Sequence, residues 1–97
     1  MLKSALGALS LASLLLALTA ASPAQAADDK FCHDYARDVI RLAKDAGDHP
    51  KCHDLLRDQD RWNADEHHHF DWCKHTDKRE VIAALDARKH DLEKCKH

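Results

Sequence analysis

The chain has 97 residues, of which 33% are charged, and its formal net charge is −2 at pH 7 with histidine neutral. This length allows one small domain and excludes a TIM barrel or a dinucleotide-binding unit with a separate substrate domain. The nearly balanced charge and the lack of a basic block argue against a nucleic-acid-binding protein.

Residues 1–26 have the layout of an export signal. A basic start at Lys3 is followed by an uncharged, leucine-rich stretch and by a small-residue triplet, typical of a cleavage site, that ends at Ala26. The alternative is a transmembrane anchor, which the short apolar run disfavours. We therefore expect a signal peptide over 1–26, and an exported domain over 27–97 that has 71 residues and is periplasmic or secreted.

The first helix is expected over residues 29–46. Its apolar residues recur at spacings of three and four, which is the period of an amphipathic helix. The stripe contains Phe31, Tyr35, Val39, Leu42 and Ala46. Asp28 or Asp29 can cap its beginning, and Gly47 can end it.

A second helix is expected over residues 50–75, because Pro50 suits a first turn and one stripe then continues for about 25 residues. The positions that recur at three and four are Cys52, Leu55, Gln59, Trp62, Glu66, His69 and Cys73. A kink near residues 63–65 is the alternative to a continuous helix.

The third helix is expected over residues 77–95. Asp77 and Glu80 have the spacing of a capping box, and the stripe repeats through Val81, Leu85, Arg88, Leu92 and Cys95. No segment has the alternation typical of a strand. Three amphipathic helices with short joins predict an all-α fold, namely an antiparallel, up-down-up bundle.

The four cysteines predict two disulfides in an exported chain of this size. The presence of four cysteines allows three different sets of disulfide pairs. On a continuous second helix, Cys52 and Cys73 would lie roughly 31 Å apart, and Cys32 would lie at the opposite end of the bundle from Cys52. The geometry of the bundle therefore predicts Cys32–Cys73 and Cys52–Cys95.

The spacing of several residues resembles a small exported four-cysteine module of alphaproteobacterial proteins. The matching residues are Cys32, Tyr35, Ala36, Arg61, Trp62, His69, Phe70, Trp72, Cys73, Arg88, Leu92 and Cys95. The resemblance covers nearly all of residues 27–97. It departs over 53–60, where the module has a glycine-containing link, which would favour a break in the second helix. It implies a helical, disulfide-bonded fold of uncharacterised function and no transferable activity.

Histidine is abundant, with nine in the chain, and suggests a possible metal site. His67, Asp71 and His75 lie on one line of a helix, and imidazole with carboxylate suits Zn²⁺, Ni²⁺ or Cu²⁺. Two weaker pairs are His49 with His53, and Asp86 with His90. The alternative for all of them is a solvated polar face. Without a strong zinc signature, no cofactor is assigned.

Three further residues have distinct expected roles. His69 lies on the apolar stripe, which predicts a buried, hydrogen-bonded structural histidine. Arg88 lies in the register of the core, where it would pair with Glu66 or Asp65 or extend its charged end to solvent. Trp72 lies off the stripe, so it is expected to be exposed and to mark a possible partner surface.

These observations favour a non-enzymatic helical module that binds an unidentified component of the cell envelope. The first alternative is low-affinity binding of a transition metal through the histidines. The second is a pH-responsive envelope protein, because protonating all nine histidines would change the net charge of residues 27–97 from −3 to +6. The sequence contains no convergent set of a nucleophile, a base and an oxyanion donor, so an enzyme is not predicted.

Overall fold

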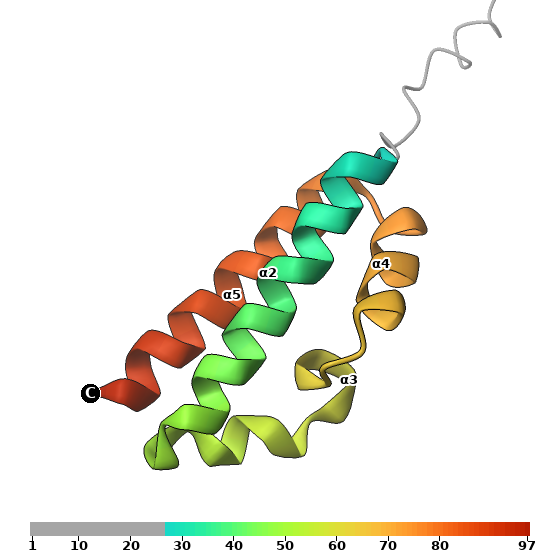
Figure 1. Ribbon diagram of the computed structural model, residues 1–97. Helices are drawn as coiled ribbons and strands as arrows, with labels where there is room; N and C mark the ends of the chain where they lie inside the picture. Colours follow the sequence, from blue (N-terminus) through green and yellow to red (C-terminus); the bar gives the residue numbers. More distant parts are fainter. Residues whose placement is uncertain (1–26) are drawn as a thin grey trace, which may run out of the picture.

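The computed structural model describes residues 27–97, and the secondary structure of this part is helical, without strands (Figure 1). Its elements are α2 (Asp29–Asp48), the 3-10 helix η2 (Pro50–Arg57), α3 (Gln59–Trp62), α4 (Glu66–Lys74) and α5 (Lys78–Lys96). The all-α prediction is therefore confirmed. The predicted signal peptide, over 1–26, lies outside the described residues.

Helix α2 begins where Asp28 caps it, because the carboxylate of Asp28 accepts a 2.8 Å hydrogen bond from the backbone N–H of Phe31. Its buried face follows the predicted stripe: Cys32, Tyr35, Ala36, Val39, Ala43 and Ala46. The helix continues through Gly47 to Asp48, two residues beyond the predicted end. The chain turns at His49, whose extended backbone ends the helix.

Helix α5 has 19 residues, and Asp77 caps it by accepting from the backbone N–H of Arg79. Val81, Arg88 and Leu92 are buried on its inner face. Figure 1 shows α5 beside α2, and the two helices are in contact along the molecule. Helix α2 is the centre of the fold, because η2, α3, α4 and α5 all pack against it.

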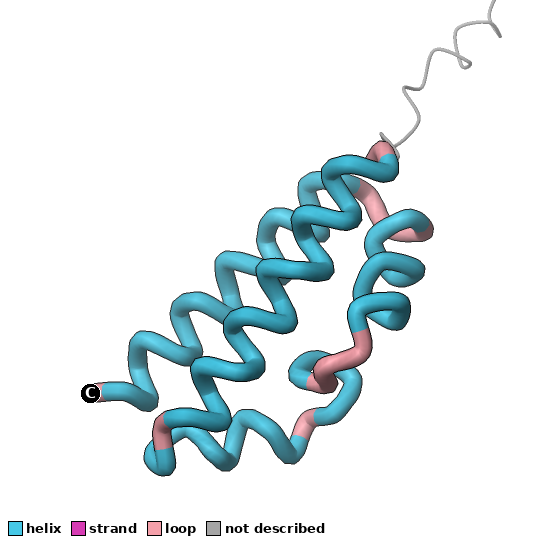
Figure 2. The backbone as a smooth tube through the Cα atoms, viewed as in Figure 1, coloured by secondary structure: helices cyan, strands magenta, loops and turns pink. Residues whose placement is uncertain are grey.

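The predicted continuous helix over 50–75 is wrong. Figure 2 shows loops that divide this segment, and it consists of η2, α3 and α4. Short polar side chains replace helical backbone bonds at each break. Asp58 caps α3 by accepting from Arg61, and Asp65 caps α4 by accepting from the N–H groups of residues 67 and 68. Between them, the Asn63 amide accepts from the N–H of Asp65.

The length of the neighbouring helix also opposes a continuous middle helix. A helix from Cys52 to Cys73 would rise about 31 Å, whereas α2 rises only about 24 Å from Cys32 to its end at Asp48. Both ends of the middle segment are fixed by disulfides to the long helices. Bending at α3 takes up the extra length of chain.

Both predicted disulfides are confirmed. Cys32 pairs with Cys73, and Cys52 pairs with Cys95, with Cα atoms 5.6 and 5.1 Å apart. Each bridge lies in its own apolar cluster. The first contains Ala27, Cys32, Tyr35, Val39, Cys73 and Val81, and the second contains Ala43, Ala46, Cys52, Trp62 and Leu92. The core is thus divided into two parts, one at each bridge. Within residues 27–97, no helix is both long and apolar enough to cross a membrane.

Candidate functional site

A pocket of about 380 Å³ lies where α3, α4 and α5 meet. Its walls are formed by Asp60 and Arg61 of α3, by His68, His69 and Trp72 of α4, and by Ala84 and Arg88 of α5. A volume of this size suits a small organic ligand. The pocket exists because the middle segment bends, which brings α3 and α4 around the inner face of α5.

Trp72 forms the apolar wall of the pocket. It is 40% exposed, so the prediction of an exposed indole is confirmed. Its ring packs against the buried ring of Tyr35, with the ring centroids 5.8 Å apart. This contact holds one side of the indole while another part of it remains accessible at the pocket. Such a half-covered aromatic side chain is suited to contact with an apolar group.

Arg88 forms the polar floor of the pocket, and it is only 5% exposed. Its Nε donates to the carbonyl of Arg61 at 2.9 Å, and its Nη1 donates to the hydroxyl of Tyr35 at 2.9 Å and to the carbonyl of Ala84 at 3.2 Å. It therefore ties α5 to α3 and α2. The predicted pairing with Glu66 or Asp65 is wrong, and the side chain is buried in the core instead of extending into solvent, with only a small part of its surface accessible.

The guanidinium of Arg88 has a buried positive charge without a carboxylate partner among residues 27–97. Its Nη2 also has no hydrogen bond there, in contrast to Nε and Nη1. No fully buried side-chain nitrogen or oxygen in the described part lacks a hydrogen-bond partner, so Nη2 retains a small accessible surface. Arg88 lines the pocket, and Nη2 is the guanidinium nitrogen that no hydrogen bond within residues 27–97 uses. Buried charges are usually paired, so this one is unusual.

His69 confirms the prediction of a structural histidine. It is 2% exposed, and its Nε2 donates to the carbonyl of Asn63 at 2.8 Å across the break between α3 and α4. Burial lowers the pKa of His69, and the positive charge of Arg88 lowers it further, while the bond to Asn63 opposes the shift. The imidazole is therefore neutral at pH 7, and its ring orientation is fixed by the bond to Asn63.

The remaining charges of the pocket are unevenly balanced. Arg61 pairs with Asp91 of α5 at 3.2 Å, so part of its charge is already compensated. Asp60 of α3 is exposed and is the one carboxylate among the lining residues. Two guanidinium groups therefore face one carboxylate. This favours an anionic ligand of low charge.

The predicted metal site is not assembled. No group of three or more His, Cys, Asp or Glu side chains in residues 27–97 is placed to hold a metal ion. His75 lies at the end of α4, and its Nδ1 donates to the carbonyl of Asp71 at 2.9 Å. Of the three residues proposed as ligands, Asp71 and His75 lie together, with Oδ1 of Asp71 3.9 Å from Nδ1 of His75, but they and His67 do not form a group of three that could hold a metal ion. The i, i+4 spacing is correct for a helix, and Nδ1 of His75 is bonded to the backbone of that helix.

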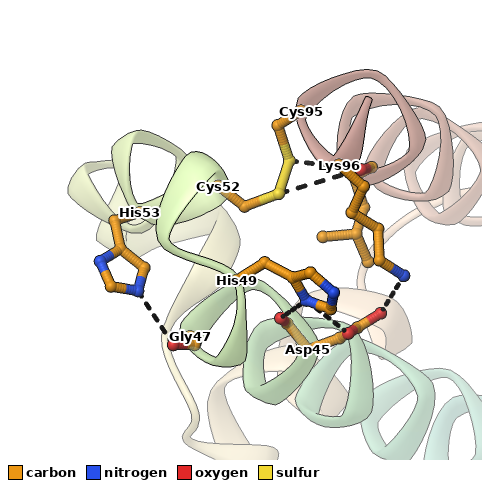
Figure 3. Close-up of a disulfide and its surroundings, with 8 residues drawn as sticks. Asp45, Gly47, His49, Cys52, His53, Cys95 and Lys96 are labelled. Atoms are coloured by element: carbon orange, nitrogen blue, oxygen red, sulfur yellow. Dashed lines mark hydrogen bonds and ion pairs between the residues drawn. A yellow bond between two sulfur atoms is a disulfide. The ribbon is translucent and has the colours of Figure 1, made fainter.

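The pair of His49 and His53 has the same role at the end of α2. Figure 3 shows both rings near the Cys52–Cys95 disulfide. His49 Nδ1 donates to the carbonyl of Asp45 at 3.0 Å, and His53 Nε2 donates to the carbonyl of Gly47 at 2.9 Å. These carbonyls belong to the last turn of α2, where no helical N–H remains to bond them. The histidines therefore act as caps.

An ion pair supports the same end of the molecule. Lys96 donates to the carboxylate of Asp45 at 2.9 Å, beside the Cys52–Cys95 bridge (Figure 3). The hydrogen bond from Lys96 lowers the pKa of Asp45. This contact joins the end of α5 to the end of α2, as the disulfide does. The groups around this bridge are bonded to one another, and their arrangement is structural.

Sequence reasoning singled out Trp72, His69 and Arg88 separately but missed that they share a pocket. It also missed Asp60 and Ala84, whose contribution depends on where α3 and α5 meet. The available signal was the group of short polar residues at 58, 63 and 65, which indicates helix breaks. Comparison of the chain with family models, with curated proteins and with solved structures gives no match.

Proposed function

We propose that this chain is an exported, non-enzymatic binding module of the cell envelope and that its ligand binds in the pocket between α3, α4 and α5. The observation that carries this proposal is the position of Trp72. An indole that is 40% exposed lies against a concave site of about 380 Å³, where it offers apolar surface to a ligand.

The exported location is supported by the cysteines. Both disulfides are compatible with an oxidising compartment, such as the periplasm or the extracellular space. The signal-like sequence over 1–26 supports the same location. The proposed up-down-up path takes η2, α3 and α4 together as its second pass. It is supported by bridges that join the start of α2 to the end of α4, and η2 to the end of α5.

Binding is proposed rather than catalysis because the polar groups of the pocket already hold the helices together. Arg88 donates to three oxygen atoms, and His69 donates to the carbonyl of Asn63. Groups fixed in this way can orient a ligand, but using them for proton transfer would break the bonds that form the site. The resemblance to the four-cysteine module is part of the same proposal.

The test is capture of envelope components by the exported, oxidised protein and by two variants. Trp72→Ala removes the apolar wall of the pocket, whereas Ile82→Ala removes an equally exposed apolar residue, 46% accessible, from a hollow between α2 and α5. We expect the wild type and Ile82→Ala to retain the same component, and Trp72→Ala to lose it. Equal retention by all three proteins would contradict the assignment of the pocket.

A further inference from the structure

We infer that the pocket binds the carboxylate of a small molecule that also carries an apolar or aromatic group. The carboxylate would accept from Nη2 of Arg88, and the apolar group would lie against Trp72. This inference rests on the proposed function, since it assumes that the pocket is the binding site. It adds the chemical class of the ligand.

The need for an anion comes from Arg88. Its charge is buried, with the whole residue 5% exposed, and no carboxylate of residues 27–97 pairs with it. Two carbonyls and a hydroxyl satisfy Nε and Nη1, which leaves the N–H groups of Nη2 for a ligand. A bound anion would neutralise the guanidinium in a site that is partly screened from water. Charge-assisted hydrogen bonds of this kind are stronger than neutral ones.

The charge balance of the pocket favours a carboxylate over phosphate. Nη2 of Arg88 supplies two N–H groups, and the charge of the second guanidinium, of Arg61, is partly compensated by Asp91. A phosphate dianion would bring two negative charges to a pocket whose lining also includes the carboxylate of Asp60. A monoanionic carboxylate brings one charge and meets less repulsion.

The need for an apolar group comes from two other lining residues. Trp72 of α4 and Ala84 of α5 add apolar side chains to the pocket, and the indole packs against the ring of Tyr35. A small hydrophilic carboxylate such as acetate would leave these side chains in water. A ligand that joins a carboxylate to a ring or a short aliphatic chain would contact both Arg88 and these side chains.

The experiment compares three probes on the oxidised, exported protein by calorimetry and by tryptophan fluorescence, at about pH 7.5 in a buffer without carboxylate or phosphate. Phenylacetate carries the proposed pair of groups, phenylacetamide is its neutral analogue, and inorganic phosphate is the competing anion. We expect phenylacetate to bind saturably, at least about tenfold more tightly than phenylacetamide and than phosphate. A peptide with a C-terminal phenylalanine, free or amidated, tests whether the carboxylate belongs to a chain end.

A matched pair of variants on α5 locates the binding. Ala84→Leu fills the pocket without changing any hydrogen bond of Arg88, because Ala84 uses its backbone carbonyl in that contact. Ala87→Leu places the same side chain on an exposed position of the same helix, outside the pocket. We expect Ala84→Leu to lose at least about tenfold in phenylacetate affinity, and Ala87→Leu to bind as the wild type does.

Arg88 itself is best tested without substitution, since it also holds the helices together. In protein with ¹⁵N-labelled arginine, the side-chain N–H signals of Arg88 should shift as phenylacetate is added, and should not shift with phenylacetamide. Binding of phenylacetate would support a small-molecule carboxylate as the ligand. Binding of the free-acid peptide alone would support a carboxylate at the end of a peptide chain. Equal binding of acid and amide, tighter binding of phosphate, or an unchanged Arg88 signal would overturn the inference.

Failure of this inference is distinguishable from failure of the proposed function. If Ala84→Leu and Trp72→Ala abolish capture of the envelope component while no carboxylate probe binds, the pocket is still the binding site and only the ligand class is wrong. If the component is captured equally by both variants, the pocket is not the binding site. The carboxylate inference is then overturned as well.

Discussion

The two long helices and the segment between them are built on different principles. Helices α2 and α5 have 20 and 19 residues, each with an aspartate at its N-terminal cap and one continuous buried face. The middle segment is divided into pieces of 8, 4 and 9 residues, too short to be stable alone. It is held by bonds from α5, such as Arg88 to the carbonyl of Arg61 and Asp91 to the guanidinium of Arg61. The pocket is therefore formed largely by the part of the fold that depends most on its neighbours.

The largest effect is expected from the disulfides, which fix both ends of the middle segment. They link residues 41 and 43 positions apart, so each contributes about 4 kcal/mol in the chain-entropy description. Full reduction should abolish the near-UV circular dichroism of Trp62 and Trp72 at room temperature. An unchanged spectrum after reduction, with free thiols verified, would show that the core holds the middle segment without the bridges.

Removing the bridges one at a time sharpens the comparison. Cys32→Ser with Cys73→Ser frees α4, which carries Trp72 and His69, whereas Cys52→Ser with Cys95→Ser frees η2. We expect both variants to lose stability, and hydrogen exchange in α4 to accelerate much more in the first. Equal exchange of α4 amides in both variants would mean that α4 does not depend on its own bridge.

The next largest effect is expected from Arg88, the side chain that joins α5 to the middle segment. Arg88→Met keeps an unbranched apolar side chain as far as the position of Nε but removes the guanidinium and its donors, leaving the Arg61 carbonyl and the Tyr35 hydroxyl without this partner. We expect a loss of about 2–4 kcal/mol in the free energy of unfolding, measured with urea. The control is Arg37→Met on the exposed side of α2, where about 0.5 kcal/mol or less is expected because the ion pair is solvated. Similar losses in both variants would contradict the role of Arg88.

The sequence predicted the long helices better than the middle segment for a physical reason. In α2 and α5 the apolar period and the aspartate caps indicate the same limits, within two residues of those observed. Both disulfide pairings followed, because they depend only on which helix ends meet. Over 50–75 the apolar period continues through Trp62 and His69, which are indeed buried. Because the period is not interrupted, it gives no indication of the helix breaks. There the side chains of Asp58, Asn63 and Asp65 compete locally with the helical backbone, which a period cannot reveal.

The pocket was less predictable than the fold. Trp72 and His69 were assigned correctly as an exposed and a buried residue, since each follows from the register of one helix. That they meet Arg88 and Asp60 depends on the angle between α3 and α4, which the break at Asn63 sets. Spacing along a helix placed Asp71 beside His75, with Oδ1 and Nδ1 3.9 Å apart, but residues 27–97 contain no group of three side chains placed to hold a metal ion.

A pH-dependent loss of stability is expected from His69. Its pKa is lowered in the folded state, chiefly by burial, with Arg88 and His68 adding to the shift and Asn63 and Asp65 opposing it. Below the unfolded pKa of about 6.5, the unfolded chain therefore binds a proton that the folded protein does not. Stability should fall as the pH falls from about 6.5 toward the folded pKa, by at most about 1.4 kcal/mol per pH unit.

His69→Gln tests this pH dependence, because glutamine can donate to the Asn63 carbonyl but does not titrate. Urea unfolding between about pH 7.5 and pH 5 should give a flatter dependence for the variant than for the wild type. The aspartates whose pKa is lowered, such as Asp29 and Asp45, gain protons below this range and do not contribute. Parallel curves for the two proteins would show that His69 is not the group responsible.

The smallest effect is expected from the helix caps, and it separates the two kinds of helix most directly. Asp28 and Asp65 each cap a helix, α2 and α4 respectively. Replacing either by alanine should lower the free energy of unfolding by about 1 kcal/mol. The two variants should differ in where hydrogen exchange of the backbone amides accelerates.

In Asp28→Ala, the long buried face of α2 should keep the amides beyond the first turn protected. In Asp65→Ala, exchange should rise through all of α4, because nine residues have little helical stability of their own. If exchange in Asp65→Ala were confined to the first turn of α4, the middle segment would be as autonomous as the long helices, and the contrast between them would not hold.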